Sequence, residues 1–365
     1  MRLDIATGVA PLPTQSAEKY FSRRLAISLL SEATFRAILS VSFCCLLLFA
    51  SCLPGFCSAW TRQPSGTMAW LHAVYFLDQN RGWVAGSNGT LLQTADGGTT
   101  WKKLSLLTRD SLDDVYFADE RNGWLLGSRD FLKLRANEPP SYVLKTEDGG
   151  LSWRQLSLNT SDSNTRFVRM LFTDAKHGWV FGETGVILAT NDGGAHWIRQ
   201  VSVTKHLLLG GSFADYQRGC LVGAGATVLR TSDSGATWQA GIMRDGGRAR
   251  LTSASLFQNF GWTVGAAGQI FATKDGGRSW LEQRSNADAD LLDVRFIDER
   301  EGWVAGTQGT LLHTIDGGVH WFTEKTESPH ALQRIFIADR DHVWVVGFGG
   351  TILRMSQSNA PKLKG

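Results

Sequence analysis

The stretch GWVAGSNGTLLQTADGGTTW, residues 82–101, carries two tryptophans, Trp83 and Trp101, whose equivalents recur along the chain of 365 residues. Within each series the step is 41 or 42 residues, except between Trp101 and Trp197, where residues are inserted. The first series is Trp83, Trp124, Trp179, Cys220, Trp262, Trp303 and Trp344, and the second is Trp60, Trp101, Trp153, Trp197, Trp238, Trp280 and Trp321. A fixed period of this length indicates repeated supersecondary units that bury their apolar faces against one another.

Each copy is predicted to form four β-strands. In the first copy, residues 71–77, 82–85, 90–94 and 100–104 are short apolar or alternating runs rich in β-forming residues, separated by glycine or polar residues. No segment inside a repeat has helical periodicity over the length of a helix. The sequence therefore predicts an all-β fold, a single seven-bladed β-propeller with four antiparallel strands per blade.

The two ends of the repeat region predict how the ring closes. Trp60 occupies the fourth-strand position but precedes the first complete copy, and the last copy ends after its third strand, near residue 355. Pairing residues 59–63 with that last copy would complete the seventh blade and remove an open sheet edge. We expect a propeller domain over residues 60–356, a leader over residues 1–59 and a C-terminal tail over residues 357–365.

The leader is predicted to direct export. Residues 37–53 are apolar and uncharged, follow three arginines, and are succeeded by small residues ending at Ala59, the order of a secretory signal. Cleavage after Ala59 would release a chain that begins at Trp60. A second interpretation is a lipoprotein signal in which Cys52 is acylated, since residues 49–52, FASC, resemble a lipobox. A third is an uncleaved anchor, although this apolar run is at the short limit for a membrane span.

Charge and cysteine content exclude several classes of protein. The formal net charge is +3, of which the repeat region carries only +1, and this balance argues against general nucleic-acid binding, which needs a strong basic excess. Cys220 is the one cysteine in the repeat region and is interpreted as a buried apolar filler. The histidines are scattered through the sequence, so we expect neither a metal site nor a cofactor.

The turn between the third and fourth strands has the form TADGGTTW, residues 94–101, and occurs six times. It resembles the Asp-box, or BNR repeat, of sialidases, sortilin-like receptors and related propellers. Aspartate can accept hydrogen bonds from nearby backbone N–H groups, and glycine can adopt positive φ, so we expect a structural role for this turn. The aspartates are Asp96, Asp148, Asp192, Asp233, Asp275 and Asp316.

A longer pattern within the repeat points to one family of Asp-box propellers. The pattern F-x-D-x-x-x-G-W-x-x-G-x-x-G-T-L-L-x-T-x-D-G-G-x-T-W, seen in residues 117–124, 82–101 and 296–321, resembles the photosystem II stability/assembly factor family of exported seven-bladed propellers. This resemblance implies a non-catalytic lumenal or periplasmic protein that assists assembly of reaction-centre proteins at a membrane through a basic patch on one face. We therefore expect a monomer whose partner is a membrane protein or its exported loops.

The candidate site is a group of basic residues on one face. Loops from fourth to first strands and from second to third strands emerge on the same face, and the largest insertions, residues 128–141 and 154–169, lie there. The predicted partner-binding residues are Arg129, Lys133, Arg135, Arg154, Arg166 and Arg169, with Arg244, Arg248, Arg250 and Arg334 across the ring. Such a surface would bind acidic loops of a partner or anionic lipid head groups. The alternative is a set of ordinary solvated arginines whose field is diluted by nearby aspartates such as Asp113.

The rival function is an Asp-box glycoside hydrolase or glycan-binding propeller of the sialidase type. Asp114 and Asp293 would have to act as a carboxylate pair, yet they belong to distant blades. Tyr75 and Tyr116 share one strand position and are interpreted as packing residues. The sequence contains no nucleophile elbow, no H-E-x-x-H motif and no phosphate-binding loop. A non-enzymatic binding protein is favoured.

Overall fold

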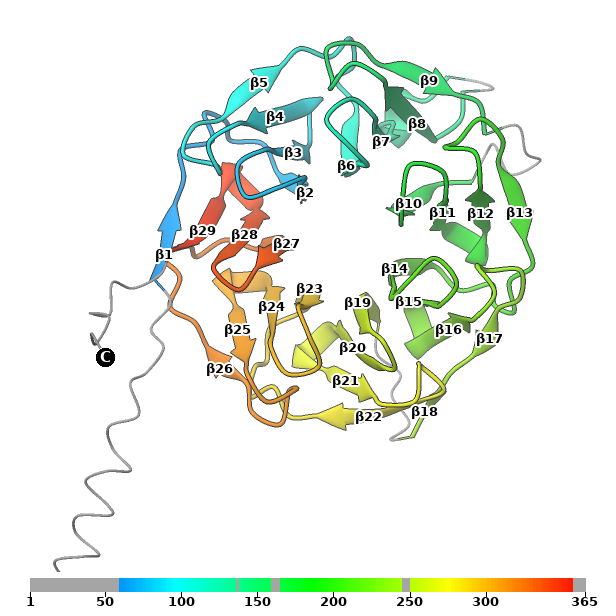
Figure 1. Ribbon diagram of the computed structural model, residues 1–365, viewed down its shortest axis with the longest axis vertical. Coiled ribbons are helices and arrows are strands. Elements are labelled where there is room, and N and C mark those ends of the chain that lie inside the picture. Colours follow the sequence, from blue (N-terminus) through cyan, green and yellow to red (C-terminus); the bar gives the residue numbers. More distant parts are fainter. Residues whose placement is uncertain (1–58, 136–137, 159–164, 245–249, 357–365) are drawn as a thin grey trace, which may run out of the picture. The chain divides into compact units, whose positions relative to one another are not determined.

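The computed structural model describes residues 59–135, 138–158, 165–244 and 250–356. Figure 1 shows seven small sheets arranged radially around an axis, which confirms the predicted seven-bladed β-propeller. Within the described ranges no helix is long and apolar enough to cross a membrane. The predicted tail and the predicted leader with Cys52 lie outside these ranges, except for Ala59, the last residue of that leader, which begins the first strand.

Blades 1 to 7 are numbered by their first strands, which surround the axis. These are β2 (Leu71–Phe76), β6 (Ser111–Phe117), β10 (Phe167–Phe172), β14 (Leu208–Phe213), β19 (Leu251–Phe257), β23 (Leu291–Phe296) and β27 (Leu332–Asp339). The second strands are β3 (Gly82–Gly86), β7 (Gly123–Ser128), β11 (Gly178–Gly182), β15 (Gly219–Gly223), β20 (Phe260–Gly265), β24 (Gly302–Gly306) and β28 (His342–Gly347).

The outer half of each blade follows the same order. The third strands are β4 (Thr90–Thr94), β8 (Ser141–Thr146), β12 (Ile187–Thr190), β16 (Thr227–Thr231), β21 (Ile270–Thr273), β25 (Leu311–Thr314) and β29 (Ile352–Ser356). The outermost strands are β5 (Lys102–Leu104), β9 (Arg154–Leu156), β13 (Ile198–Gln200), β17 (Gln239–Ala240), β22 (Ser279–Gln283), β26 (Phe322–Thr323) and β1 (Ala59–Arg62). Short 3-10 turns join second to third strands, namely η1 (Phe131–Lys133), η2 (Glu183–Gly185), η3 (Ala224–Ala226), η4 (Ala266–Gly268), η5 (Thr307–Gly309) and η6 (Phe348–Gly350).

The ring closes as predicted. Strand β1 pairs antiparallel with β29, with Trp60 opposite Met355, so blade 7 combines one N-terminal strand with three C-terminal strands. One addition was not predicted. The short strand β18 (Ile242–Met243) pairs in parallel with β22, which gives blade 5 a fifth strand.

Neighbouring blades are held together by a repeated three-ring contact. The ring of Trp83, on the second strand of blade 1, stacks on Phe117, on the first strand of blade 2, with centroids 3.6 Å apart. Phe117 in turn meets Trp153 of its own blade edge-on at 6.1 Å. Equivalent Trp–Phe–Trp sets join four other pairs of blades. Both tryptophan series are therefore explained by burial between blades.

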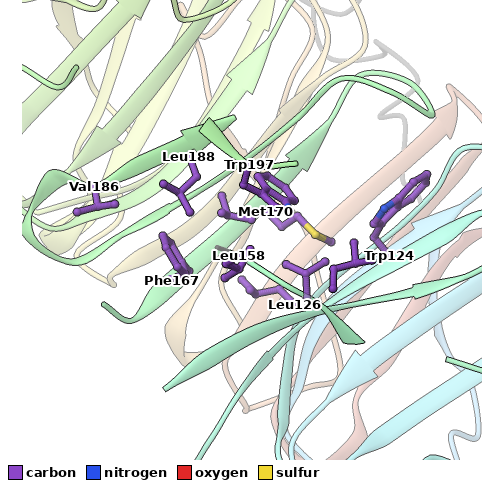
Figure 2. Close-up of a cluster of buried hydrophobic side chains, with 11 residues drawn as sticks. Trp124, Leu126, Leu158, Phe167, Met170, Val186, Leu188 and Trp197 are labelled. Atoms are coloured by element: carbon purple, nitrogen blue, oxygen red, sulfur yellow. The ribbon is translucent and has the colours of Figure 1, made fainter. Parts of the chain in front are cut away.

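Figure 2 shows the contact between blades 2 and 3, where Trp124 and Trp197 enclose an apolar cluster with Met170 and Leu188. In most blades a glycine precedes the second-strand tryptophan and makes room for a phenylalanine on the adjacent first strand, whereas Val343 precedes Trp344 in blade 7. A Cβ at Gly123 would lie 2.5 Å from the ring of Phe117, a distance that no real contact allows. The Gly-Trp dipeptide of the repeat therefore has a packing cause.

The Asp-box turns all lie on one face, here called the Asp-box face. In the first turn, Thr100 donates its backbone N–H to Asp96 Oδ1 at 2.8 Å and its hydroxyl to Asp96 Oδ2 at 2.6 Å. Thr94 donates its hydroxyl to Asp96 Oδ1 and accepts the N–H of Gly98, whose φ is +90°. Each carboxylate thus binds the turn that carries it, and this places the following tryptophan against the sheet.

Closure of the ring by Trp60 gives a stability prediction. Because the buried indole packs with Trp303 and Met355, Trp60→Ala should lower the free energy of unfolding by about 3–5 kcal/mol in denaturant titrations. Deleting residues 60–64 should lower the Tm further, since blade 7 would lose its outer strand. Trp70→Ala is the matched control, because Trp70 is 41% exposed, and it should cost less. Equal losses for Trp60→Ala and Trp70→Ala would contradict this account.

The Asp-box carboxylates predict a loss of stability in acid. Hydrogen bonds from the hydroxyls of Thr100 and Ser152 lower the pKa of Asp96 and Asp148 to about 2. An aspartate in the unfolded chain has a pKa of about 3.9, so the stabilisation is complete above about pH 4 and is lost as pH falls toward 2. Asp96→Asn should be less stable at neutral pH and should show a shallower decline of unfolding free energy in that window. Identical slopes for variant and wild type would rule out this contribution.

Candidate binding site at the mouth of the axial channel

A β-bulge near the start of every first strand shapes the axis of the ring. In β2 the pairing register skips His72, which lies between Leu71 and Ala73, and the six other first strands skip the equivalent residue. A bulge changes the direction in which a side chain points. The seven residues that the register skips all line one cavity of about 280 Å³. These residues are His72, Asp113, Val168, Leu209, Thr252, Leu292 and Gln333.

This cavity is the mouth of the axial channel, on the face opposite the Asp-box turns, here called the mouth face. Four arginines of the predicted set also line it, namely Arg166, Arg169, Arg250 and Arg334. One lining carboxylate, Asp113, opposes them. Burial lowers the pKa of His72, and the charge of Asp113 partly offsets that effect. The mouth is therefore a concave surface with an excess of positive charge.

Arg169 and Arg334 are buried structural cations as well as lining residues. Arg334 Nη1 lies 3.6 Å from Asp293 Oδ1, and Arg334 Nε donates to the carbonyl of His72 at 3.3 Å. Asp293 also accepts the backbone N–H of Ile335 at 2.9 Å, so this group ties blades 6, 7 and 1 together. The position equivalent to Arg334 is Arg169, because each follows the bulge in its strand.

The contacts of Arg169 are less complete. Its Nη1 lies 3.4 Å from Asp114 Oδ2, an ion-pair distance without hydrogen-bond geometry. Its Nε and Nη1 are buried and have no hydrogen-bond partner among the described residues, although Arg169 is only 3% exposed. Buried donors without partners are costly, and a charged guanidinium most favours a carboxylate or another oxyanion. The Nε and Nη1 donors of Arg169 are therefore buried and unsatisfied beside the channel mouth.

Arg166 and Arg250 supply the accessible positive charge of the mouth. Arg166 Nη2 lies 3.3 Å from the Ser128 hydroxyl and is half-buried. Arg250 is exposed, and its side chain has no ion-pair partner in the part of the chain that the structure describes. Neither guanidinium group forms an ion pair with a described residue.

Other predicted basic residues do not join the mouth. Arg154 lies at the start of β9, directly after an Asp-box turn, and pairs with Glu147 at 3.3 Å, so its grouping with Arg166 was wrong. The Arg129 guanidinium covers the Tyr142 ring at 4.5 Å and donates to the Pro139 carbonyl. Arg135 is exposed on the same loop, and Arg244 is exposed directly after β18.

The side chains of two predicted residues lie outside the part of the chain that the structure describes. Arg248 lies outside the described residues. Lys133 ends η1, and its side chain is likewise outside them. The sequence prediction missed His72 as a residue of the mouth. Its position in the repeat could have identified it, because His72 follows Leu71 at the start of the first strand as Asp113 follows Leu112.

The channel below the mouth is aromatic. A second cavity of about 270 Å³ is lined by Tyr75, Tyr116 and Phe336, together with the inner sides of Arg169 and Arg334. Tyr75 meets Tyr116 and Phe336 edge-on at 5.0 and 5.2 Å. Burial raises the pKa of Tyr75 to about 12 and raises that of Tyr116 as well. Among the described residues, no group of three or more His, Cys, Asp or Glu side chains is placed to hold a metal ion.

The protein is a seven-bladed propeller of the Asp-box type. Its seven sheets form a closed ring, with the Asp-box turns on one face and a polar channel mouth on the other. The chain belongs to the family described as photosynthesis system II assembly factor YCF48, which matches residues 56–113, 100–207, 199–286 and 280–359. The curated photosystem II assembly lipoprotein Ycf48 of Synechococcus sp. (strain CC9902) is 34% identical over 64 residues, which cover 17% of this chain and 19% of that relative.

Solved structures agree on the fold. The structure described as YCF48 bound to D1 peptide has a TM-score of 0.68 and 22% identity, covering 84% of this chain and 97% of that one. The GH74 xyloglucanase of Xanthomonas campestris has a TM-score of 0.64 and 14% identity, covering 84% of this chain and 55% of that one. At such identities the likeness concerns the fold alone.

The buried pair of Asp293 and Arg334 gives a prediction about the channel. Asp293→Ala would leave the Arg334 guanidinium buried without its carboxylate, so the free energy of unfolding should fall by about 3–5 kcal/mol in denaturant titrations. Glu147→Ala removes the exposed partner of Arg154 and should leave stability nearly unchanged. A tolerated Asp293→Ala would show that the channel pair is dispensable.

Proposed function

We propose that this chain is a non-catalytic binding protein that holds an anionic segment of a partner protein at the channel mouth while a membrane protein complex is assembled. The observation that carries the proposal is Arg169, a buried guanidinium with unused donors in a cavity that all seven blades line. A carboxylate of the partner in this cavity would compensate the charge of Arg169, whose pairing with Asp114 is incomplete. Arg166 and Arg250 would add attraction at longer range and speed association.

Family membership supports photosystem II as the complex and an exported segment of one of its membrane proteins as the partner. The YCF48 structure described as bound to D1 peptide supports a peptide segment as the form in which such a partner binds. A single closed ring with a mouth on its own axis needs no second copy to complete the site, so we propose that the protein acts as a monomer.

The enzyme alternative has weaker support. Asp114 and Asp293, its candidate carboxylates, lie near Arg169 and Arg334 respectively and accept backbone N–H groups of the neighbouring blade. The raised pKa of Tyr75 and of Tyr116 keeps both phenols protonated, which disfavours a tyrosine nucleophile. The xyloglucanase shares the architecture at 14% identity. We therefore propose a binding role without catalysis.

The propeller is proposed to act on the exported side of a membrane. The relative from Synechococcus is named as a lipoprotein, which supports membrane tethering through acylated Cys52 over release after Ala59. Mass spectrometry of the mature chain would distinguish a diacylglyceryl group on Cys52 from an N-terminus at Trp60.

Charge reversal tests the mouth. Arg166→Glu/Arg250→Glu should weaken binding of a D1 peptide about tenfold or more by calorimetry, because two accessible cations become anions beside Asp113. Arg169 is unsuitable for this test, since reversing a buried charge next to Asp114 would damage folding. Arg154→Glu changes charge on the opposite face and should leave affinity unchanged. Equal affinities for the mouth variant and the Arg154 variant would overturn the proposal.

A further inference from the structure

The contact between blades 4 and 5 lacks the stacked rings found at the five Trp–Phe–Trp contacts. Cys220 occupies the second-strand tryptophan position of blade 4. Leu256, on blade 5, pairs with Gly261 as Phe76 pairs with Gly82, so it occupies the phenylalanine position. Cys220 is fully buried with Val222 and Trp280, as predicted for an apolar filler, and burial raises the pKa of its thiol to about 12. Both rings of the usual stack are therefore replaced by smaller side chains.

A cleft of about 350 Å³ lies at this contact, on the Asp-box face. Leu256 forms part of its wall, and Asp275 and Gly276 of the blade 5 Asp-box turn form another part. Four cations line it, namely Arg218, Arg230, Lys274 and Arg278. Its volume is within the range of small-molecule sites.

The loss of the tryptophan also frees one of these cations. Arg230 pairs across the strands with Cys220, as Lys145 pairs with Trp124 and Arg354 pairs with Trp344. Lys145 Nζ and Arg354 Cζ lie 5.4 and 5.9 Å above the tryptophan rings opposite them. Arg230 has no ring to cover, and its guanidinium instead donates to the side chain of Gln239. Because Gln239 is neutral, the charge of Arg230 stays uncompensated at the cleft.

The other charges of the cleft leave a positive excess. Arg218 is paired with Asp215 at 2.7 Å and is therefore largely neutralised. Lys274 and Arg278 are exposed and form no ion pair with any described residue. Asp275 is the one lining carboxylate, and its oxygens already accept hydrogen bonds from Thr273 and from Ser279. Three cations thus remain to attract an anion into a concave space.

We propose that this cleft is an anion site for a phosphate or sulfate group, formed where Cys220 and Leu256 replace the stacked rings. Arginine guanidinium groups match tetrahedral oxyanions through paired donors, and the lysine adds a point charge. The site lies on the face opposite the channel mouth and does not depend on the function proposed for that mouth. Its ligand is either a soluble phosphate or sulfate ester or the head group of an anionic lipid.

Inorganic pyrophosphate titrated into the full purified chain by calorimetry is the primary test. The wild type should bind it, and Lys274→Gln/Arg278→Gln should weaken that binding about tenfold or more. Cys220→Trp/Leu256→Phe should abolish it by refilling the cleft, while circular dichroism and the Tm report whether the ring still folds. Arg300→Gln removes an exposed arginine from a blade 6 turn on the same face and should leave binding unchanged.

Two results would overturn the proposal even if Cys220→Trp/Leu256→Phe failed to fold. One is absence of pyrophosphate binding by the wild type, and the other is equal binding by the wild type and the Lys274→Gln/Arg278→Gln variant.

Sedimentation with vesicles of phosphatidylglycerol and phosphatidylcholine in equal parts identifies the source of the ligand. Binding that the lysine and arginine variants remove assigns a lipid head group, and pyrophosphate binding without vesicle binding assigns a soluble ester.

Discussion

The structure depends on the stacking of a tryptophan of one blade on a phenylalanine of the next. A four-stranded sheet cannot bury its own faces, so each blade is stable only against its neighbours. The stack supplies large apolar area and a defined geometry, and an edge-on tryptophan from the outer strand encloses it. The glycine of the Gly-Trp dipeptide makes room for the phenylalanine, and the Asp-box turn places the outer-strand tryptophan. Strand β1 closes the ring by pairing with β29, which gives blade 7 its outer strand.

A second constraint acts on the axis, where seven first strands converge. The bulge in each strand turns one side chain toward the channel, and the following residue packs between blades. Polar residues at that second position must find partners in the next blade, as Asp293 does with Arg334 and Ile335. Arg169 meets this requirement only in part. The same residues that join the blades therefore also contribute to the charge of the mouth.

Departures from the repeat coincide with the two surfaces that we propose for binding. On the mouth face, the arginines stand directly before the first strand or directly after its bulge in blades 3, 5 and 7, at positions where blades 1 and 4 carry residues such as Ala73, Leu207 and Gly210. On the Asp-box face, a cleft bordered by cations lies at the one blade contact where Cys220 and Leu256 take the places of the stacked rings. Both surfaces use positive charge, but they lie at opposite ends of the blades. A tethered or soluble propeller could therefore engage a partner at one face and a second anion at the other.

Repeat spacing determined the seven blades, their four-strand order, the closure by Trp60 and the Asp-box turns, because each of these follows from local periodicity and from short-range hydrogen bonds. Tertiary structure decided which basic residues meet. Arg154 and Arg166 belong to one inserted stretch, yet Arg154 begins a strand on the Asp-box face and Arg166 lies at the opposite end of the blades. Cys220 was recognisable as a buried filler, but the cleft beside it depends on Leu256 in the next blade, 36 residues later. Contacts between blades join residues that no local pattern relates, and only the folded ring specifies them.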